Sequence, residues 1–205
     1  MKKNEVLTLT VERFADQGKV LAKVNGYVVF FKGAAPGDVV QVRTTKVKKN
    51  YAEALLLGVL SPSPLRVAPT CRYFGVCGGC KWQHVGYEHQ LIAKRESVED
   101  ALIHTGGFQE VKVQPTIGME APWFYRNKME FSFSTQRWLT DAEMGTEQPV
   151  ERNFALGLHA PGRFDKVLDL EMCHLQSELS ARIVNGLRQY AKENQWPAWD
   201  TRKQT

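Results

Sequence analysis

Residues 19–31, KVLAKVNGYVVFF, carry the strongest folding signal in this sequence. Two runs rich in β-branched and aromatic residues flank the dipeptide Asn25-Gly26, and such residues favour extended strands. Asn and Gly tolerate the positive φ angles that a tight two-residue hairpin turn requires. The stretch therefore predicts two antiparallel strands joined by a turn at residues 25–26.

The segments on either side of this hairpin extend it into a small all-β domain. Residues 6–13, VLTLTVER, alternate apolar and polar side chains as a half-buried strand does. After the hairpin, the turn APGD at residues 35–38 leads into VVQVRTTKV and then YAEALLLGVL. Five strands without a helical period predict an N-terminal all-β, five-stranded OB-like barrel, which we place at residues 1–62.

The remainder of the chain, residues 63–205, mixes helical and strand-like patterns. The proline-rich segment SPSPLRVAP at residues 61–69 predicts an extended linker. Residues 87–107 have apolar side chains at helical spacing and end in two glycines, and residues 177–194 form a second helical pattern. The strand-like runs VKVQPTI, YRNKMEFSFS, NFALGLHA and FDKVLDL lie between them without regular alternation. We therefore predict an α+β domain.

The positive charge of the chain is concentrated in its first 60 residues. The whole chain has 27 Lys or Arg and 22 Asp or Glu, a formal net charge of +5. Residues 1–60 hold ten of the basic and five of the acidic residues, so the remaining residues are neutral overall. A basic module on a neutral body favours binding to a polyanion such as RNA or DNA, although a solvated basic face is an equally good interpretation.

The sequence contains no segment suited to membrane insertion or export. Its longest apolar run, ALLLGVL at residues 54–60, is too short to span a bilayer. The N-terminus lacks the apolar core and the cleavage site of a signal peptide. We therefore expect a cytoplasmic, monomeric protein that does not engage membranes. In that compartment a cysteine cluster indicates metal or redox chemistry rather than disulfides.

Three of the four cysteines lie in the stretch CRYFGVCGGCKWQH at residues 71–84. Cys71, Cys77 and Cys80 follow a C-x5-C-x2-C spacing, and Cys173 lies far downstream. Three clustered thiols with a distant fourth are typical of plant-type ferredoxin clusters, whereas zinc sites more often use two separated pairs. The spacing therefore favours an iron–sulfur cluster over zinc, and over cysteines that are merely buried or reactive.

Basic and aromatic side chains indicate where RNA would bind. The lysines of TKVKKN and the polar–aromatic stretch after the cysteine cluster are candidates, because phosphates need cations and unstacked bases need aromatic faces. The segment YRNK at residues 125–128 places two further cations on one side of a predicted strand. The RNA-binding candidates are Lys46, Lys48, Lys49, Lys81, Trp82, His84, Arg126 and Lys128. Phe14, Tyr27 and Tyr51 are further stacking candidates that suit the barrel core equally well.

The order of these features resembles the RNA uracil-5-methyltransferase family. A basic barrel is followed by C-x5-CGGC-x-WQH, then by W-x-YRNKMEFSFS, and then by a distant cysteine in DLEMCHL. The resemblance implies that the barrel is a TRAM domain and that residues 63–205 are a central domain with a 4Fe-4S cluster. It also implies the cluster ligands Cys71, Cys77, Cys80 and Cys173. The enzymes that act on 23S ribosomal RNA are the most similar in the family.

Two features of that family are missing from this sequence. Family enzymes bind S-adenosylmethionine on a Rossmann-like sheet and use a cysteine nucleophile. This sequence has no Gly-rich strand–helix turn and no cysteine beyond the four assigned to the cluster. We therefore expect the RNA-binding and iron–sulfur portion of such an enzyme, truncated before its catalytic domain and inactive alone. The alternatives are a stand-alone metal-stabilised RNA-binding module, a tRNA uracil-5-methyltransferase fragment, and a small redox iron–sulfur protein.

Overall fold

The structure, a computed structural model, describes residues 1–200 and 202–203, which form two compact units. Unit 1 comprises Met1–Pro69 and Lys81–Glu120, and unit 2 comprises Thr70–Cys80 and Ala121–Thr205. The boundary expected after residue 62 does not coincide with these units. The chain enters unit 2 for the short loop 70–80, returns to unit 1, and enters unit 2 again after residue 120.

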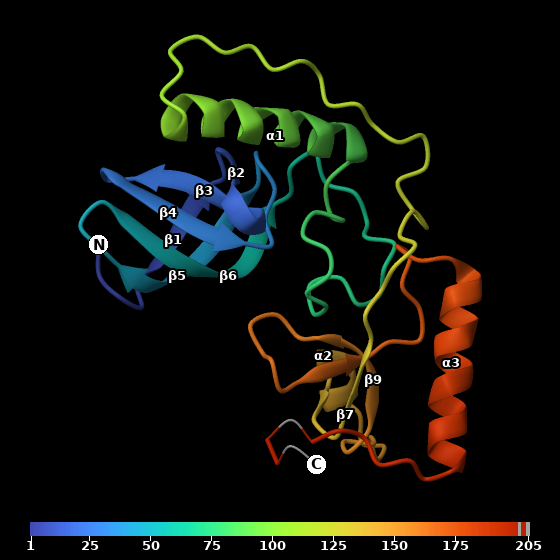
Figure 1. The fold of residues 1–205 in the computed structure, drawn as a ribbon. Coiled ribbons are helices and arrows are strands. Elements are labelled where there is room, and N and C mark those ends of the chain that lie inside the picture. The colour runs from blue at the N-terminus through green and yellow to red at the C-terminus, as the bar shows by residue number, and fades with distance from the viewer. Residues whose placement is uncertain (201, 204–205) are drawn as a thin grey trace. The chain divides into compact units, whose positions relative to one another are not determined.

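Unit 1 is built on a curled six-stranded sheet (Figure 1). The strands lie in the order β1-β5-β6-β4-β3-β2, and every pair is antiparallel except β4 with β6. The strands are β1 (Val6–Thr10), β2 (Arg13–Ala15), β3 (Lys19–Val24), β4 (Tyr27–Lys32), β5 (Val39–Val47) and β6 (Tyr51–Ser61). All five expected strands are present. The sixth, β2, has only three residues, which is too short for its periodicity to be recognised in the sequence.

The hairpin between β3 and β4 has the geometry that its sequence predicts. Asn25 and Gly26 have φ angles of 49° and 77°, as a type I′ turn requires. The long strand β5 shifts its register against β6 at three places, one of them between Thr44 and Lys46. Such irregularities bend a strand, which allows β5 and β6 to curve around the core.

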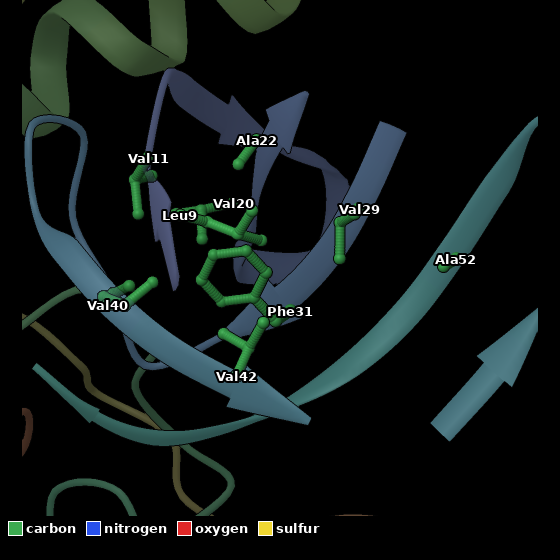
Figure 2. Close-up of a cluster of buried hydrophobic side chains, with 10 residues drawn as sticks. Leu9, Val11, Val20, Ala22, Val29, Phe31, Val40, Val42 and Ala52 are labelled. Carbon is green, nitrogen blue, oxygen red and sulfur yellow. The ribbon is translucent and has the colours of Figure 1, made fainter. Parts of the chain in front are cut away.

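A core of small and branched apolar side chains fills the curled sheet (Figure 2). Its buried members are Leu9, Val11, Val20, Ala22, Val29, Phe31, Ala34, Val40, Val42 and Ala52. Strand β5 alternates from Val40 to Thr45, with Val42 buried between the exposed Gln41 and Arg43. A strand with one face toward a core needs this alternation, and it leaves the outer face of β5 to polar and charged side chains.

The segment 61–69, which its prolines predicted as an extended linker, is held in place by hydrogen bonds. The fully buried carboxylate of Asp38 accepts hydrogen bonds from Nε and Nη2 of Arg66, each at 2.8 Å. It also accepts one from the backbone N–H of Ser63 at 2.8 Å. Arg66 Nη2 donates a further bond to the carbonyl oxygen of Gly33 at 3.1 Å. These bonds hold the chain that leaves the sheet against the turn before β5.

Helix α1 (Tyr87–Asp100) confirms the first expected helix, and it continues as a π-helical turn over Ala101–Thr105. Ala93 is the one buried residue of α1, whereas Ile92 and Val98 are 45% and 49% exposed. The sequence therefore predicted the helix. It did not predict that the described residues leave most of the apolar face of the helix exposed.

The strand expected at residues 111–117 is absent from the structure, where this segment is irregular. Its hydrogen bonds go to residues of helix α1 instead of to a neighbouring strand. The backbone N–H of Val113 donates to the carboxylate of Glu99 at 3.1 Å, and the hydroxyl of Thr116 donates to the carbonyl oxygen of Leu91 at 3.0 Å. The segment is therefore attached to α1 by these hydrogen bonds and takes no place in a sheet.

Unit 2 combines a four-stranded sheet, in the order β7-β9-β10-β8, with helix α3. The elements are β7 (Ser132–Ser134), β8 (Arg137–Trp138), α2 (Asp141–Met144), β9 (Ala155–His159), β10 (Val167–Asp169) and α3 (Glu178–Glu193). The strand expected over residues 125–134 is largely wrong. Only its last three residues pair in the sheet, whereas Arg126 makes an isolated bridge with Gln176. No helix of the described residues is long and apolar enough to cross a membrane.

Arg188 joins α3 to the sheet of unit 2. Its side chain is paired with Asp169 at 3.0 Å, and Nη2 donates to the carbonyl oxygens of Leu156 and Leu170. Gly157 on β9 fits only without a side chain, because a Cβ there would lie 1.9 Å from the carbonyl oxygen of Leu168. These contacts fix the end of β10, from which the chain runs directly toward Cys173.

We expect Asp38→Asn to destabilise unit 1 by about 3 kcal/mol, because removing one partner of a buried ion pair leaves the other uncompensated. Burial by itself raises the pKa of the Asp38 carboxyl group, but the bonds from Arg66 and from the backbone of Ala35 and Ser63 outweigh it and hold the pKa below its usual range. The contribution is therefore complete above the unfolded pKa of about 3.9 and lost as the pH falls through the folded pKa.

Urea denaturation of the wild type and the variant over a series of pH values measures this effect. The matched control is Glu12→Gln, since Glu12 forms an exposed pair with Lys23 at 3.7 Å and such pairs contribute less than about 1 kcal/mol. Equal denaturation midpoints for Asp38→Asn and Glu12→Gln at neutral pH would contradict the role assigned to Asp38.

Candidate metal centre and nucleic-acid interface

The cysteine loop, residues 70–80, is anchored in unit 2 by Tyr73. The ring of Tyr73 is buried against Leu168 of strand β10. Its hydroxyl accepts a hydrogen bond from the backbone N–H of Glu171 at 3.3 Å, and the neighbouring Arg72 pairs with the Glu171 carboxylate at 2.5 Å. Because Cys173 lies two residues beyond Glu171, these contacts bring the fourth cysteine to the loop that carries the other three.

The loop itself is a series of tight turns. The backbone N–H of Phe74 donates to the carbonyl oxygen of Cys71 at 3.0 Å, and that of Cys77 donates to the carbonyl oxygen of Tyr73 at 2.8 Å. The backbone N–H of Gly79 points at Sγ of Cys77, 3.4 Å away. Hydrogen bonds from the backbone to sulfur are characteristic of thiolate ligands, whose charge and potential they tune.

The four thiols are close enough to influence one another. Burial raises the pKa of the Cys71 and Cys77 thiols, and the negative charge of the neighbouring cysteines raises it further. The cysteines that act on Cys77 are Cys80, Cys173 and Cys71. The contacts of Tyr73 and Arg72 with Glu171 place Cys173 near the loop that carries the other three cysteines.

The four candidate ligands are cysteine sulfurs, but their side chains are not positioned to hold a single metal ion. In the part of the chain that the structure describes, no three His, Cys, Asp or Glu side chains are arranged to hold a metal ion as they stand. Tetrahedral zinc with thiolates at about 2.3 Å would hold their sulfurs about 3.8 Å apart. Thiolates also ligate larger iron–sulfur clusters, so the chemistry of the donors fits either group. His174, beside Cys173, instead contacts the rings of Trp123 and Phe124, with centroids 6.2 Å away in each case.

Three lysines form an exposed cationic group where β5 meets β6. Lys46 lies on β5 itself, and Lys48 and Lys49 lie in the turn that follows. All three side chains are exposed, and none forms an ion pair with a residue that the structure describes. Glu53 lies opposite Lys46 in the register, but its carboxylate pairs with Lys19 at 3.7 Å. The three charges therefore face solvent without compensation.

Lys81 and Trp82 contact the barrel within unit 1. A Cβ on Gly18 would lie 2.8 Å from Cβ and Cδ of Lys81, so the stem of this lysine lies directly over the glycine. The ring of Trp82 packs on Phe14, with centroids 4.7 Å apart. Lys81 is exposed and Trp82 is half-buried, so both retain surface that a ligand could contact.

His84 is buried, which contradicts its expected role in RNA recognition. Its side chain is 4% exposed, and Nε2 lies 3.1 Å from the carbonyl oxygen of Ala34. Burial also lowers the pKa of the imidazole, so the ring is neutral at physiological pH. His84 therefore packs the returning chain against the sheet. The sequence could not reveal this, because the partner lies 50 positions away.

Arg126 and Lys128 lie beside the cysteine loop. With Gly78, Gly79 and other residues they line an open pocket of about 450 Å³ in unit 2. Lys128 pairs with Glu130 at 2.8 Å, but both side chains are at least 80% exposed, and such a surface pair is weak. The structure thus brings two predicted cations to the glycines between the last two loop cysteines, although not on the strand that was expected to carry them.

Sequence reasoning missed the residues that anchor the loop. Tyr73 and Glu171 are 98 positions apart, so no local spacing could connect them. The one signal was the pair of aromatic residues Tyr73 and Phe74 inside the cysteine cluster, of which only Tyr73 is buried as an anchor.

A comparison with protein families identifies the barrel. Residues 2–57 match the TRAM domain family, and this range covers β1 to β5 and most of β6. The fold as a whole is similar to the crystal structure of the Pyrococcus abyssi tRNA (uracil-54, C5)-methyltransferase in complex with S-adenosyl-L-homocysteine. The TM-score is 0.59 and the identity 22%, over 97% of this chain and 40% of that one.

Relatives in sequence extend over almost the whole chain. An uncharacterised RNA methyltransferase of Porphyromonas gingivalis is 41% identical over 96% of this chain and 43% of its own length. An uncharacterised RNA methyltransferase of Bacteroides thetaiotaomicron is 43% identical over 93% of this chain and 42% of its own length. One of Chlorobaculum tepidum is 45% identical over 94% of this chain and 40% of its own length. The chain thus contains a TRAM domain and is homologous to about two fifths of proteins named as RNA methyltransferases.

Proposed function

We propose that this chain is the RNA-binding portion of an S-adenosylmethionine-dependent RNA uracil-5-methyltransferase, with 23S ribosomal RNA as its substrate. The observation that carries the proposal is the TRAM barrel with three uncompensated lysines at one end, in a chain whose relatives are named RNA methyltransferases. The choice of uracil and of ribosomal RNA rests on the motif order C-x5-CGGC, YRNK and distant cysteine. The protein acts in the cytoplasm as a monomer.

In this proposal the 205 residues hold RNA, and methyl transfer takes place elsewhere in the full-length enzyme. The lysines at the end of β5 contact phosphates, which position a strand without reading its sequence. Arg126 and Lys128 extend this contact near the cysteine loop. S-adenosylmethionine and the nucleophile belong to the part of the relatives that this chain does not match, because its own sequence has neither a Gly-rich cofactor turn nor a cysteine to spare.

We also propose that Cys71, Cys77, Cys80 and Cys173 hold a 4Fe-4S cluster with a structural role. The proposal is supported by the all-sulfur donor set, by the N–H···S hydrogen bond to Cys77, and by the contacts that bring Cys173 to the loop. When bound, the cluster crosslinks the loop to the segment after β10. The residues of the chain supply the thiolates, exclude water through the Tyr73 ring, and hold the backbone N–H groups toward sulfur.

RNA binding is tested with the triple variant Lys46→Ala, Lys48→Ala, Lys49→Ala and single-stranded RNA over a range of salt concentrations. Each neutralised phosphate contributes about 0.7 to the slope of log affinity against log salt, so we expect the slope to fall by about 2. The matched control replaces Lys94, Lys112 and Lys203, which are exposed and lie outside the barrel. If both triple variants change the slope equally, the effect is one of net charge, and the barrel end is not the RNA surface.

The cluster is tested by metal and sulfide analysis of protein purified without oxygen. We expect iron and acid-labile sulfide in the wild type, and loss of both in Cys77→Ser and Cys173→Ser, because binding of the group and folding of its site are linked. The control Tyr190→Phe removes one hydroxyl from a half-exposed residue of α3 that takes no part in anchoring the loop, so it should keep both elements. Stoichiometric zinc without sulfide would replace the 4Fe-4S proposal with a zinc site.

A further inference from the structure

Unit 1 contains a second candidate site, a pocket of about 500 Å³ between the barrel and helix α1. Strands β2, β3, β4 and β6 contribute one side and α1 the other, and Figure 1 shows α1 beside β2 and β3. The side chains that matter for its chemistry are Phe14, Phe30, Tyr51, Trp82, Glu96 and Asp100. Its volume lies within the range of small-ligand sites, about 300–1,000 Å³.

Two pairs of aromatic rings line this pocket. Phe14 and Trp82 contact each other at a tilt of 45° with centroids 4.7 Å apart, and Phe30 and Tyr51 meet edge to face at 6.3 Å. Tyr51 is 36% exposed, so its ring offers a surface to a ligand. Any nucleic-acid base can stack on such rings, because every base has an aromatic face. The pocket therefore suits a flat aromatic ligand.

The charges of the pocket argue against a phosphate. Its cations are occupied, since Arg13 pairs with Asp100 at 2.9 Å and Lys19 pairs with Glu53 at 3.7 Å. Glu96 and Asp16 also line it, and within the described chain neither has a cationic partner. Uncompensated carboxylates repel phosphate but accept hydrogen bonds from amino groups, as they do from the exocyclic amine of cytosine.

The indole N–H group of Trp82 is buried and lacks a hydrogen-bond acceptor among the residues that the structure describes. A buried donor without a partner is costly, and a ligand or water that supplies an acceptor would remove that cost. Because Trp82 lines the pocket, its indole N–H signal should respond when a ligand contacts the ring.

We propose that this pocket binds one unpaired RNA base that carries an exocyclic amine, with its phosphates held outside by the barrel lysines. The base stacks on Tyr51 and on the Phe14–Trp82 pair, and its amine donates to Glu96. The inference rests on the proposed RNA-binding function and deepens it, because it assigns base recognition to a pocket distinct from the lysines that contact phosphate.

The test is a nuclear magnetic resonance titration of the full 205-residue chain with cytidine monophosphate, uridine monophosphate and inorganic phosphate. The indole N–H signal of Trp82 is identified by its absence in Trp82→Phe. We expect a saturable shift of this signal with cytidine monophosphate, a weaker response to uridine monophosphate, and none with phosphate. Tyr51→Ala should weaken the cytidine response at least about five-fold, from the stacking contribution of one base. Glu96→Ala should remove the preference over uridine.

Phe108→Ala is the matched control, because Phe108 is 57% exposed in unit 1 and does not line the pocket. No shift of the Trp82 signal with cytidine monophosphate, or an equal shift with inorganic phosphate, overturns the inference. The lysine variant separates the two proposals. If RNA binding depends on Lys46, Lys48 and Lys49 while the Trp82 signal stays unmoved, the pocket inference alone fails. If the Trp82 signal responds but the triple lysine variant binds RNA as tightly as the wild type, the proposed phosphate surface fails instead.

Discussion

The buried ion pair between Asp38 and Arg66 is the constraint on which the arrangement of unit 1 depends. It fixes the point where the chain leaves the sheet, immediately before the cysteine loop. The same segment also receives the returning chain, because Arg66 bridges Val85 and the backbone N–H of Gly86 donates to the carbonyl oxygen of Leu65 at 3.0 Å. Both ends of the excursion that carries three cysteines are therefore held by hydrogen bonds within one unit.

The cysteine loop gains its second set of constraints inside unit 2. There the Tyr73 ring and the Arg72–Glu171 pair act over a separation of almost half the chain. Within unit 2 these contacts tie the loop to the segment that carries Cys173, although no three ligating side chains among the described residues are yet spaced to hold a metal ion. The proposed structural role of the metal follows from this arrangement, because a bound group would join the loop to the segment after β10.

The features predicted correctly from the sequence are those that depend on residues close together in the chain. Local signals predicted the Asn25-Gly26 hairpin, the alternation of β5 and both long helices, because turn chemistry and periodicity act within a few residues. The burial of His84 and the ion pair of Arg66 could not be predicted, because each depends on a partner that only the fold brings close. These partners are Ala34 and Asp38. The four-cysteine pattern indicated a shared site, but the residues that assemble it carry no recognisable motif.

The central claim is that the TRAM barrel, rather than unit 2, is the principal RNA contact. Ultraviolet crosslinking of the whole chain to single-stranded RNA, followed by identification of the crosslinked residues by mass spectrometry, tests it directly. Crosslinks should concentrate at Tyr51 and Trp82, the aromatic residues nearest the proposed path of the strand. Crosslinks confined to exposed aromatic residues of unit 2, such as Tyr190 and Trp196, which are 51% and 52% exposed, would contradict the claim.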